Sequence, residues 1–226
     1  MPTRPLIVCD VNETLLDLDS LEPLFADIFG VPGRMREWFG QVILYSEALS
    51  LAGRYVPFGD LGGGVLRMLG DIHGVAIEAD RVRQLAALIA DMPVHADVAA
   101  GLAVLKDAGF AIVTLTNTPA SPGPDPLDRA GLGAVFDRRF SVDAVRCFKP
   151  TPATYRLVQD TMAAAPETTW MVAAHTWDTI GAQAFGWKGA LITRGVNAPL
   201  VLESVPQPTV VARDFAEAAD AIVAAS

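Results

Sequence analysis

The chain has 226 residues, with 26 acidic side chains against 17 Lys and Arg, so its formal net charge is −9. This balance argues against nucleic-acid binding, which needs clustered Lys and Arg to neutralise phosphates. About half of the residues are apolar and only 19% are charged, enough to bury a large core. No apolar run approaches the ~18 residues of a membrane span, no signal peptide is recognisable, and two cysteines make no disulfide framework. We therefore expect a soluble, cytoplasmic globular protein without nucleic-acid or membrane partners.

The first strand signal is the apolar run of residues 6–9, which ends abruptly at Asp10. A continuous apolar run is typical of a strand buried on both faces of a parallel sheet. The segment that follows, residues 16–96, shows no strand pattern. Its four amphipathic patterns predict helices over residues 21–28, 34–51, 58–69 and 79–89. The triplet Gly62–Gly64 lacks the Gly-Lys-Ser/Thr of a P-loop, which favours helix over a phosphate-binding loop.

From residue 97 onward, strand and helix patterns alternate. The strands are predicted over 111–115, 168–173, 190–193 and 209–211, and the helices over 98–108, 151–164, 177–185 and 214–225. The proline-rich stretch 119–126 is predicted to be a loop or a broken helix start. The alternation predicts an α/β protein with a Rossmann-like, doubly wound parallel sheet. We expect residues 1–15 and 97–226 to form this core and residues 16–96 to form an inserted four-helix cap.

Polar side chains lie where the predicted strands end, and ligands of an open α/β sheet bind outside the carboxyl ends of its strands. These side chains are Asp10, Asn12 and Thr14 after the first strand, Thr116 and Asn117 after the second, His175 and Asp178 after the third, and Lys149 before a helix. Each alone could cap a helix, charge its first turn or face solvent. Together, in one doubly wound order, they indicate an active site.

These residues resemble the haloacid dehalogenase superfamily, and the resemblance covers nearly the whole chain. It rests on Asp-x-x-x-Thr-Leu from Asp10, Thr-Asn at 116–117, Lys149-Pro150 and the late Asp178. The helical insertion directly after the first strand also matches. Within the superfamily, the chain is most similar to the L-2-haloacid dehalogenases, on the motif 54–58, Tyr155 six residues after Lys149, and Trp177-Asp178.

The resemblance implies hydrolytic dehalogenation of short 2-haloalkanoic acids to 2-hydroxy acids. Asp10 would displace the halide and form an aspartyl ester that water hydrolyses. Lys149 would keep Asp10 ionised, Thr14 would hold its carboxylate, and Asp178 would orient Lys149 and the water. The implied substrate contacts are Val11, Asn12, Phe39, Ile43, Phe58, Thr116, Asn117, Tyr155, His175 and Trp177. The resemblance implies no metal or other cofactor. It does imply a homodimer formed through the cap helices.

Position 12 separates two branches of this superfamily. Its phosphatases carry a second Asp two residues after the nucleophile, as general acid for the leaving alkoxide. Asn12 cannot donate and regain a proton, whereas a halide leaves without protonation. A small-molecule phosphatase stays as an alternative function. A catalytically impaired scaffold with a binding role is a third, against which the intact Asp10, Thr14, Lys149 and Asp178 argue.

The chain also departs from the dehalogenases at several positions. Asn12, Glu13, Ala173 and His175 stand where that family usually has Tyr, Gly, Ser and Asn. Phe39 stands where a cap helix of the family carries a halide-binding arginine, and residues 38–45 contain no basic side chain. Phe39 is open to two interpretations, as core of a cap helix or as the wall of an apolar halide pocket with Ile43, Phe58 and Trp177. His175 is either a packed, hydrogen-bonded residue or a group that titrates in the working range.

Overall fold

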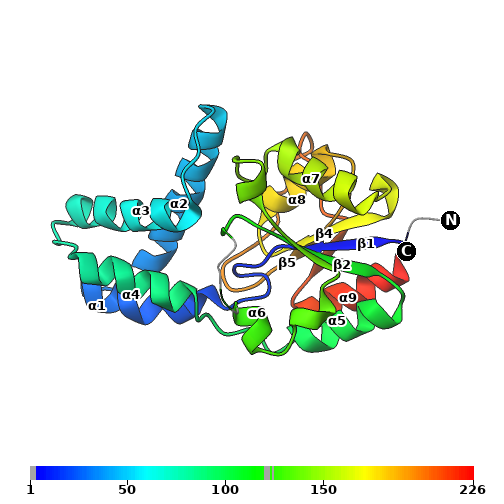
Figure 1. Cartoon of the computed structure of the whole chain (residues 1–226), viewed down its shortest axis with the longest axis horizontal. Helices are drawn as coiled ribbons and strands as arrows, with labels where there is room; N and C mark the ends of the chain where they lie inside the picture. The colour runs from blue at the N-terminus through cyan, green and yellow to red at the C-terminus, as the bar shows by residue number, and fades with distance from the viewer. Residues whose placement is uncertain (1–3, 120–122, 124) are drawn as a thin grey trace.

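The structure is a computed structural model that describes residues 4–119, 123 and 125–226. Its strands are β1 (Leu6–Cys9), β2 (Ala111–Thr116), β3 (Arg138–Ser141), β4 (Thr169–Ala173), β5 (Lys188–Ile192) and β6 (Val210–Ala212). All neighbours pair in parallel in the order β3-β2-β1-β4-β5-β6 (Figure 1). The direction of winding reverses between β1 and β4, so the ligand-binding crevice of this fold lies at their carboxyl ends. The predicted doubly wound sheet is confirmed.

Four helices follow β1 and precede α5 (Val98–Asp107): α1 (Glu22–Phe29), α2 (Arg34–Leu51), α3 (Phe58–His73) and α4 (Ala79–Ile89). They form a group beside the sheet, at the left of Figure 1. The remaining helices are α5 (Val98–Asp107), α6 (Pro126–Arg129), α7 (Pro152–Met162), α8 (Thr176–Ala184) and α9 (Phe215–Ala224). Figure 1 shows α5 and α9 below the sheet and α7 and α8 above it. Four short 3-10 turns span Leu18–Leu21, Gly133–Val135, Val142–Ala144 and Pro166–Thr168.

The central strands are buried on both faces because helices cover both sides of the sheet. All four residues of β1 and all five of β4 are buried, which explains their uninterrupted apolar sequences. Cys9 pairs in register with Thr114 of β2 and Val172 of β4. The residue after Cys9, Asp10, therefore emerges at the switch point between β1 and β4. The buried side chain of Cys9 belongs to the apolar core.

Two elements, β3 and α6, do not appear among the predictions, and both are short and charged. Arg139 of β3 pairs with Asp125 and Asp128, which flank and form α6. This edge of the sheet is held by ion pairs, so its sequence carries no apolar run. The Gly62–Gly64 triplet lies inside α3, as predicted, and α3 continues to His73. Of the proline-rich stretch, residues 120–122 and 124 lie outside the described residues, and α6 begins at Pro126.

Within the described part of the chain, no helix combines the length and the apolarity needed to cross a bilayer.

Candidate active site

Asp10 lies at the carboxyl end of β1, where its backbone N–H donates to the Val172 carbonyl at 3.0 Å. Its side chain is buried. The following turn returns the chain so that Thr14 Oγ1 donates to Asp10 Oδ2 at 2.6 Å. Thr14 Oγ1 also accepts from the Ala174 backbone N–H at 2.9 Å, which fixes the threonine between β4 and Asp10. The predicted Asp10–Thr14 pair is thus brought together.

Lys149 supplies a buried positive charge beside this carboxylate. Its Nζ donates to Asp10 Oδ1 at 2.8 Å and to Asp178 Oδ2 at 3.1 Å. The same atom lies 5.4 Å from the ring centre of Trp177, within range of a cation–π contact. Burial opposes the lysine's charge, but the two carboxylates raise the pKa of Lys149 above its usual value. The ammonium is therefore fully charged.

The two carboxyl groups beside Lys149 differ in proton affinity. Burial alone would raise the pKa of Asp10, but the charges of Lys149 and His175 hold it well below the usual range. The pKa of Asp178 is raised to about 7 by burial, with the charge of Asp10 adding to the rise against that of Lys149. Because the environments push the two values apart, Asp10 is the ionised group and the better nucleophile.

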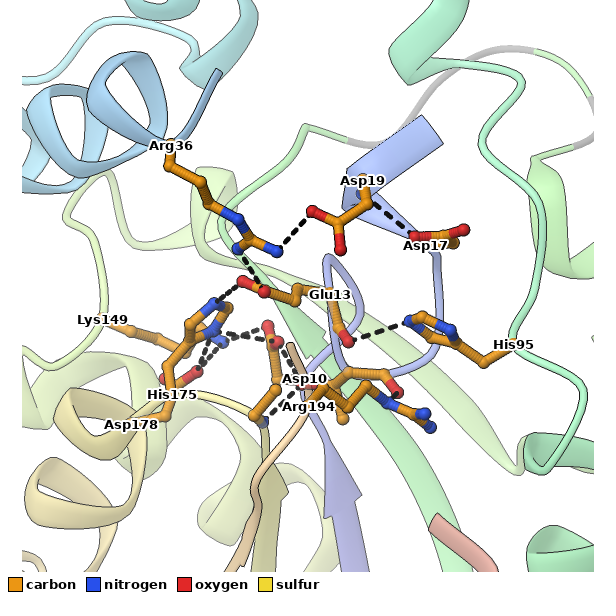
Figure 2. A network of polar contacts seen from close by, with 12 residues as sticks. Asp10, Glu13, Asp17, Asp19, Arg36, His95, Lys149, His175, Asp178 and Arg194 are labelled. Atoms are coloured by element: carbon orange, nitrogen blue, oxygen red, sulfur yellow. Dashed lines mark hydrogen bonds and ion pairs between the residues drawn. The ribbon is translucent and has the colours of Figure 1, made fainter. Parts of the chain in front are cut away.

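A second series of contacts reaches the other oxygen of the Asp10 carboxylate (Figure 2). His175 Nδ1 lies 3.6 Å from Asp10 Oδ2, and His175 Nε2 lies 2.8 Å from Glu13 Oε2. Glu13 Oε1 accepts from Arg36 of α2, whose other nitrogen donates to Asp19 Oδ1 at 2.6 Å. The imidazole thus bridges two carboxylates. Burial opposes its charge, but the two carboxylates beside it raise the pKa of His175 to about 9.

Glu13, Arg36 and Asp19 are site residues that the sequence interpretation missed. Glu13 has φ +67°, in the left-handed region, which accounts for glycine at this position in the dehalogenases that the chain resembles. Arg36 precedes Phe39 by three residues on α2, and residues so spaced share a helix face. That spacing was the available signal, because it places a guanidinium one turn from the position where an arginine was expected.

Phe39 contacts aromatic rings both within α2 and at the site. Its ring centre lies 6.3 Å from that of Trp38 within α2 and 5.4 Å from that of His175. The indole of Trp177 also stacks on the imidazole of His175, with 5.0 Å between the ring centres and 12° between the planes. Phe39 also lines a small cavity of about 30 Å³ together with Asn12, Phe58 and Thr118. It belongs to the core of the helical segment and also contacts His175. A role in a halide pocket stays a prediction.

The remaining predicted residues lie around this centre without touching the Asp10 carboxylate. Asn117 Oδ1 accepts from the Lys149 backbone N–H at 3.0 Å, and Thr116 Oγ1 accepts from that of Thr118 at 3.1 Å. Tyr155, fully buried, donates its hydroxyl to the Asp178 carbonyl at 3.3 Å. Val11 and Ile43 belong to the apolar core or pack against it. Contacts of these residues with substrate stay a prediction.

Among the described residues, donor atoms of Asp10, His175 and Asp178 lie within 4.8 Å of one another, close enough to hold a cation. The Lys149 ammonium already contacts both of these carboxylates. We therefore assign no metal here, and independence of metal stays a prediction.

Behind Glu13 a polar cavity of about 250 Å³ opens, with charges of both signs in its wall. It is lined by Glu13, Asp17, Leu18, Asp19, Arg36, His95, Thr193, Arg194, Gly195 and Arg213. The Glu13 carboxylate therefore separates this cavity from His175.

Residues 5–186 match the haloacid dehalogenase-like hydrolases. The chain belongs to this family. The (S)-2-haloacid dehalogenase H-109 of Pseudomonas putida is 28% identical over 216 residues, which cover 95% of this chain and 96% of the relative. The (S)-2-haloacid dehalogenase 1 of Pseudomonas sp. strain CBS-3 is 28% identical over 207 residues, or 90% and 91% of the two chains.

Solved structures of family members have the same fold as this haloacid dehalogenase-like hydrolase. The L-2-haloacid dehalogenase of Xanthobacter autotrophicus superposes with a TM-score of 0.81 at 24% identity, covering 97% of this chain and 98% of the other. The L-2-haloacid dehalogenase RSc1362 gives a TM-score of 0.88 at 24% identity, covering 97% and 99%. The resemblance drawn from the strand-end motifs is confirmed at the level of family and fold.

Proposed function

We propose that this hydrolase removes the halogen from short 2-haloalkanoic acids, including the (S)-2-haloacids named for its relatives, and releases 2-hydroxy acids. The observation that carries the proposal is the state of Asp10. Its carboxylate is buried at the switch point of the sheet, ionised, and held at one oxygen by Lys149 and at the other by Thr14. A carboxylate fixed in this way is suited to attack carbon and form a covalent ester.

In the first half of the reaction, an Asp10 oxygen attacks the carbon that bears the halogen. The carbon–oxygen bond forms as the carbon–halogen bond breaks, and the halide leaves with the bonding electrons. Asn12 supports this chemistry over phosphate transfer, because its amide donates to Thr118 Oγ1 at 3.0 Å and offers no acid for an alkoxide.

The departing halide gains a full negative charge, which a positioned cation stabilises. Phe39 cannot supply that charge. We propose that the imidazolium of His175, which contacts the rings of Phe39 and Trp177, takes the place of the family's arginine. The small cavity beside Phe39 and Phe58 favours short acyl chains.

The proposal also covers domain organisation, location, partners and metal dependence. Helices α1–α4 act as a cap, residues 16–96, over a core of residues 1–15 and 97–226. The protein acts in the cytoplasm as a homodimer without nucleic-acid or membrane partners. No metal takes part, since Lys149 supplies the positive charge beside Asp10.

Product analysis tests the proposed reaction. The purified protein is incubated with chloroacetate and both enantiomers of 2-chloropropionate, with and without EDTA, beside p-nitrophenyl phosphate. We expect equal amounts of halide and 2-hydroxy acid, at rates that EDTA leaves unchanged. Phosphate release that Mg²⁺ restores after EDTA, without halide release, would assign the protein to the phosphatase alternative.

The nucleophile is tested by Asp10→Asn, which keeps the volume but removes the charge. Turnover should vanish while the circular dichroism spectrum stays that of the wild type, and Asp107→Asn, an exposed position on α5, should be fully active. In a single turnover in heavy-oxygen water, the label should enter Asp10 before any product. Label that reaches the hydroxy acid in the first turnover would show that water attacks the carbon directly.

A further inference from the structure

Within the part of the chain that the structure describes, two buried polar atoms on side chains around Asp10 have no hydrogen-bond partner. They are His175 Nδ1 and Asp178 Oδ1. His175 Nδ1 lies 3.6 Å from Asp10 Oδ2 and 4.0 Å from Asp178 Oδ2, so all three groups converge. Buried polar atoms are nearly always paired, and two unpaired atoms on side chains that surround a nucleophile indicate a place where a small polar molecule binds.

Contacts of Nε2 and of the ring fix the orientation of the His175 imidazole. Its Nε2 lies 2.8 Å from Glu13 Oε2, and Glu13 is held in turn by Arg36 of α2. Its ring lies against Trp177 and Phe39. Because a carboxylate accepts the Nε2 proton, the neutral ring carries its lone pair on Nδ1, the atom that faces Asp10 (Figure 2). A carboxylate that fixes the tautomer of a histidine is how hydrolases prepare a general base.

We propose that His175, positioned by Glu13, accepts the proton of the water that hydrolyses the Asp10 ester. Asp178 Oδ1, the second unpartnered atom, accepts the water's other hydrogen and orients it. The inference rests on the proposed function, because the ester must form before it is hydrolysed. It also gives Glu13 a role that glycine could not fill.

The charge of Asp10 decides whether His175 is an acid or a base. In the free enzyme the carboxylates of Asp10 and Glu13 keep the imidazole protonated, with its pKa raised to about 9 against the effect of burial. Esterification makes Asp10 neutral and removes one of these two partners. The pKa of His175 then falls, and Nδ1 releases its proton to solvent water. This proton and the halide together are the acid that the overall reaction produces.

The hydrolysis then balances. The Nδ1 lone pair takes one proton from the water, and the water oxygen bonds to Asp10 Cγ, while Lys149 stabilises the negative carbonyl oxygen. The bond between Cγ and the ester oxygen breaks, and the departing alkoxide takes the proton of the new carboxyl group. The products are the 2-hydroxy acid, the Asp10 carboxylate and the His175 imidazolium, which is the state of the free enzyme.

The groups that surround His175 come from four elements. Asp10 and Glu13 face it from the turn after β1, Asp178 from α8, Lys149 from the segment before α7, and Arg36 lies behind Glu13 on α2. Of these five, only Asp10 changes its covalent state during the reaction. The change in proton affinity of His175 is therefore tied to the presence of the ester.

The test compares His175→Gln and Glu13→Gln with a matched pair elsewhere. His73 Nε2 lies 3.1 Å from Glu37 Oε1 between α3 and α2, so His73→Gln and Glu37→Gln remove a second histidine–glutamate pair without touching the site. Rapid-quench experiments with (S)-2-chloropropionate measure halide and lactate separately, and mass spectrometry measures the adduct on Asp10.

For His175→Gln we expect halide release that is slower than in the wild type and stops at one halide per active site, accumulation of the Asp10 ester, and lactate formation at least ~100-fold slower than in the wild type. In the wild type the rate of ester hydrolysis should rise with pH as His175 loses its proton. Glu13→Gln removes a charge that favours the imidazolium, so that limb should move to lower pH. If Glu13 had only a structural role, Glu13→Gln would lower the amount of active enzyme and leave the pH dependence of ester hydrolysis unchanged. His73→Gln and Glu37→Gln should release halide and lactate at the wild-type rates.

The proposal is overturned if His175→Gln hydrolyses the ester at the wild-type rate, or if it slows halide release without accumulating ester. Should His175→Gln fail to fold, His175→Asn, which carries the dehalogenases' usual residue, is judged by the same measurements. A wild-type protein that releases no halide from any 2-haloacid would instead refute the proposed function, and the inference would fall with it. The two failures are thus distinguishable.

Discussion

At the scale of single residues, the site is governed by how charges share a buried volume. Asp10, Lys149, His175 and Asp178 are all buried, and an isolated charge at such a depth would be strongly destabilising. Their mutual contacts compensate for the lost water. The same contacts set the protonation states that the chemistry needs, because each opposite charge favours the ionised form of its neighbour.

Lys149→Met should lower kcat by orders of magnitude, because Asp10 would then lose its nearest positive charge and take up a proton more easily. The acid limb of the pH–rate profile should move to higher pH. Lys106→Met is the control. Lys106 belongs to α5, and its substitution removes an ion pair with Asp137 that includes no residue of the site. An acid limb at its wild-type position would show that Thr14 and His175 suffice to keep Asp10 ionised.

His175 should also make stability depend on pH. Its pKa is about 9 in the folded protein against an ordinary 6.5, so the folded state binds more protons between these values. The stabilisation is complete below pH 6.5 and is lost as pH rises toward 9. We expect the free energy of unfolding, measured with urea, to fall by on the order of 2 kcal/mol across this window.

The matched variants separate this effect from general alkaline destabilisation. In His175→Gln the decrease between pH 7.5 and pH 9 should disappear, whereas His73→Gln should retain it. An equal decrease in all three proteins would mean that other groups cause it. This comparison of variants starts at pH 7.5 because Asp178, whose pKa is raised to about 7, also changes charge at lower pH.

At the scale of elements, the helices that carry Phe39 and Phe58 pack through glycines of α3. Trp38 Nε1 donates to the Gly62 carbonyl at 2.9 Å, and a Cβ at Gly62 would lie 3.1 Å from the indole. Of the Gly62–Gly64 triplet, the first glycine therefore allows α2 to pack closely on α3. The third glycine, Gly64, faces open space.

This difference predicts opposite effects of the same substitution within α3. Gly64→Ala should raise the free energy of unfolding by ~0.5–1 kcal/mol, because alanine loses less backbone entropy in a helix. Gly70→Ala should lower it by ~1–3 kcal/mol, since the new Cβ would lie 2.5 Å from the Val75 carbonyl oxygen. Urea denaturation measures both. A neutral Gly70→Ala would show that the segment after α3 moves aside without cost.

At the scale of the whole molecule, α2 contacts the active site at one end and exposes apolar side chains farther along. Its Arg36 joins the helical group to the turn after β1 through Glu13. Farther along, Leu44 is 54% and Leu51 is 90% exposed, seven residues apart on one face, with Tyr45 also exposed. Apolar side chains gathered on one helix face are typical of a surface that a second chain covers.

The proposed homodimer predicts a particle of twice 24.0 kDa in size-exclusion chromatography with light scattering. Leu44→Glu combined with Leu51→Glu should produce a monomer, because charges would then be buried in the interface. Val201→Glu, at a 77% exposed position outside α2, is the control and should leave the dimer intact. A wild-type monomer, or a double variant that still dimerises, would contradict a dimer through α2.

The sequence by itself determined what depends on near neighbours along the chain. Apolar runs and helical periodicity predicted β1, β2 and β4 and the helices around them, because each pattern reports the burial of its own element. The Asp10–Thr14 pair was also predictable, since one turn brings the two residues together. The family followed from the same strand-end residues.

Only the tertiary structure decided what depends on contacts between distant elements. Glu13 meets Arg36 across 23 residues and His175 across 162, and no periodicity records such a meeting. The short edge elements β3 and α6 were missed for a related reason, since Arg139, Asp125 and Asp128 stabilise them by ion pairs instead of an apolar pattern. Burial leaves a trace in the sequence of each element, but the pairing of charges between elements is settled only when the fold brings them within a few ångströms.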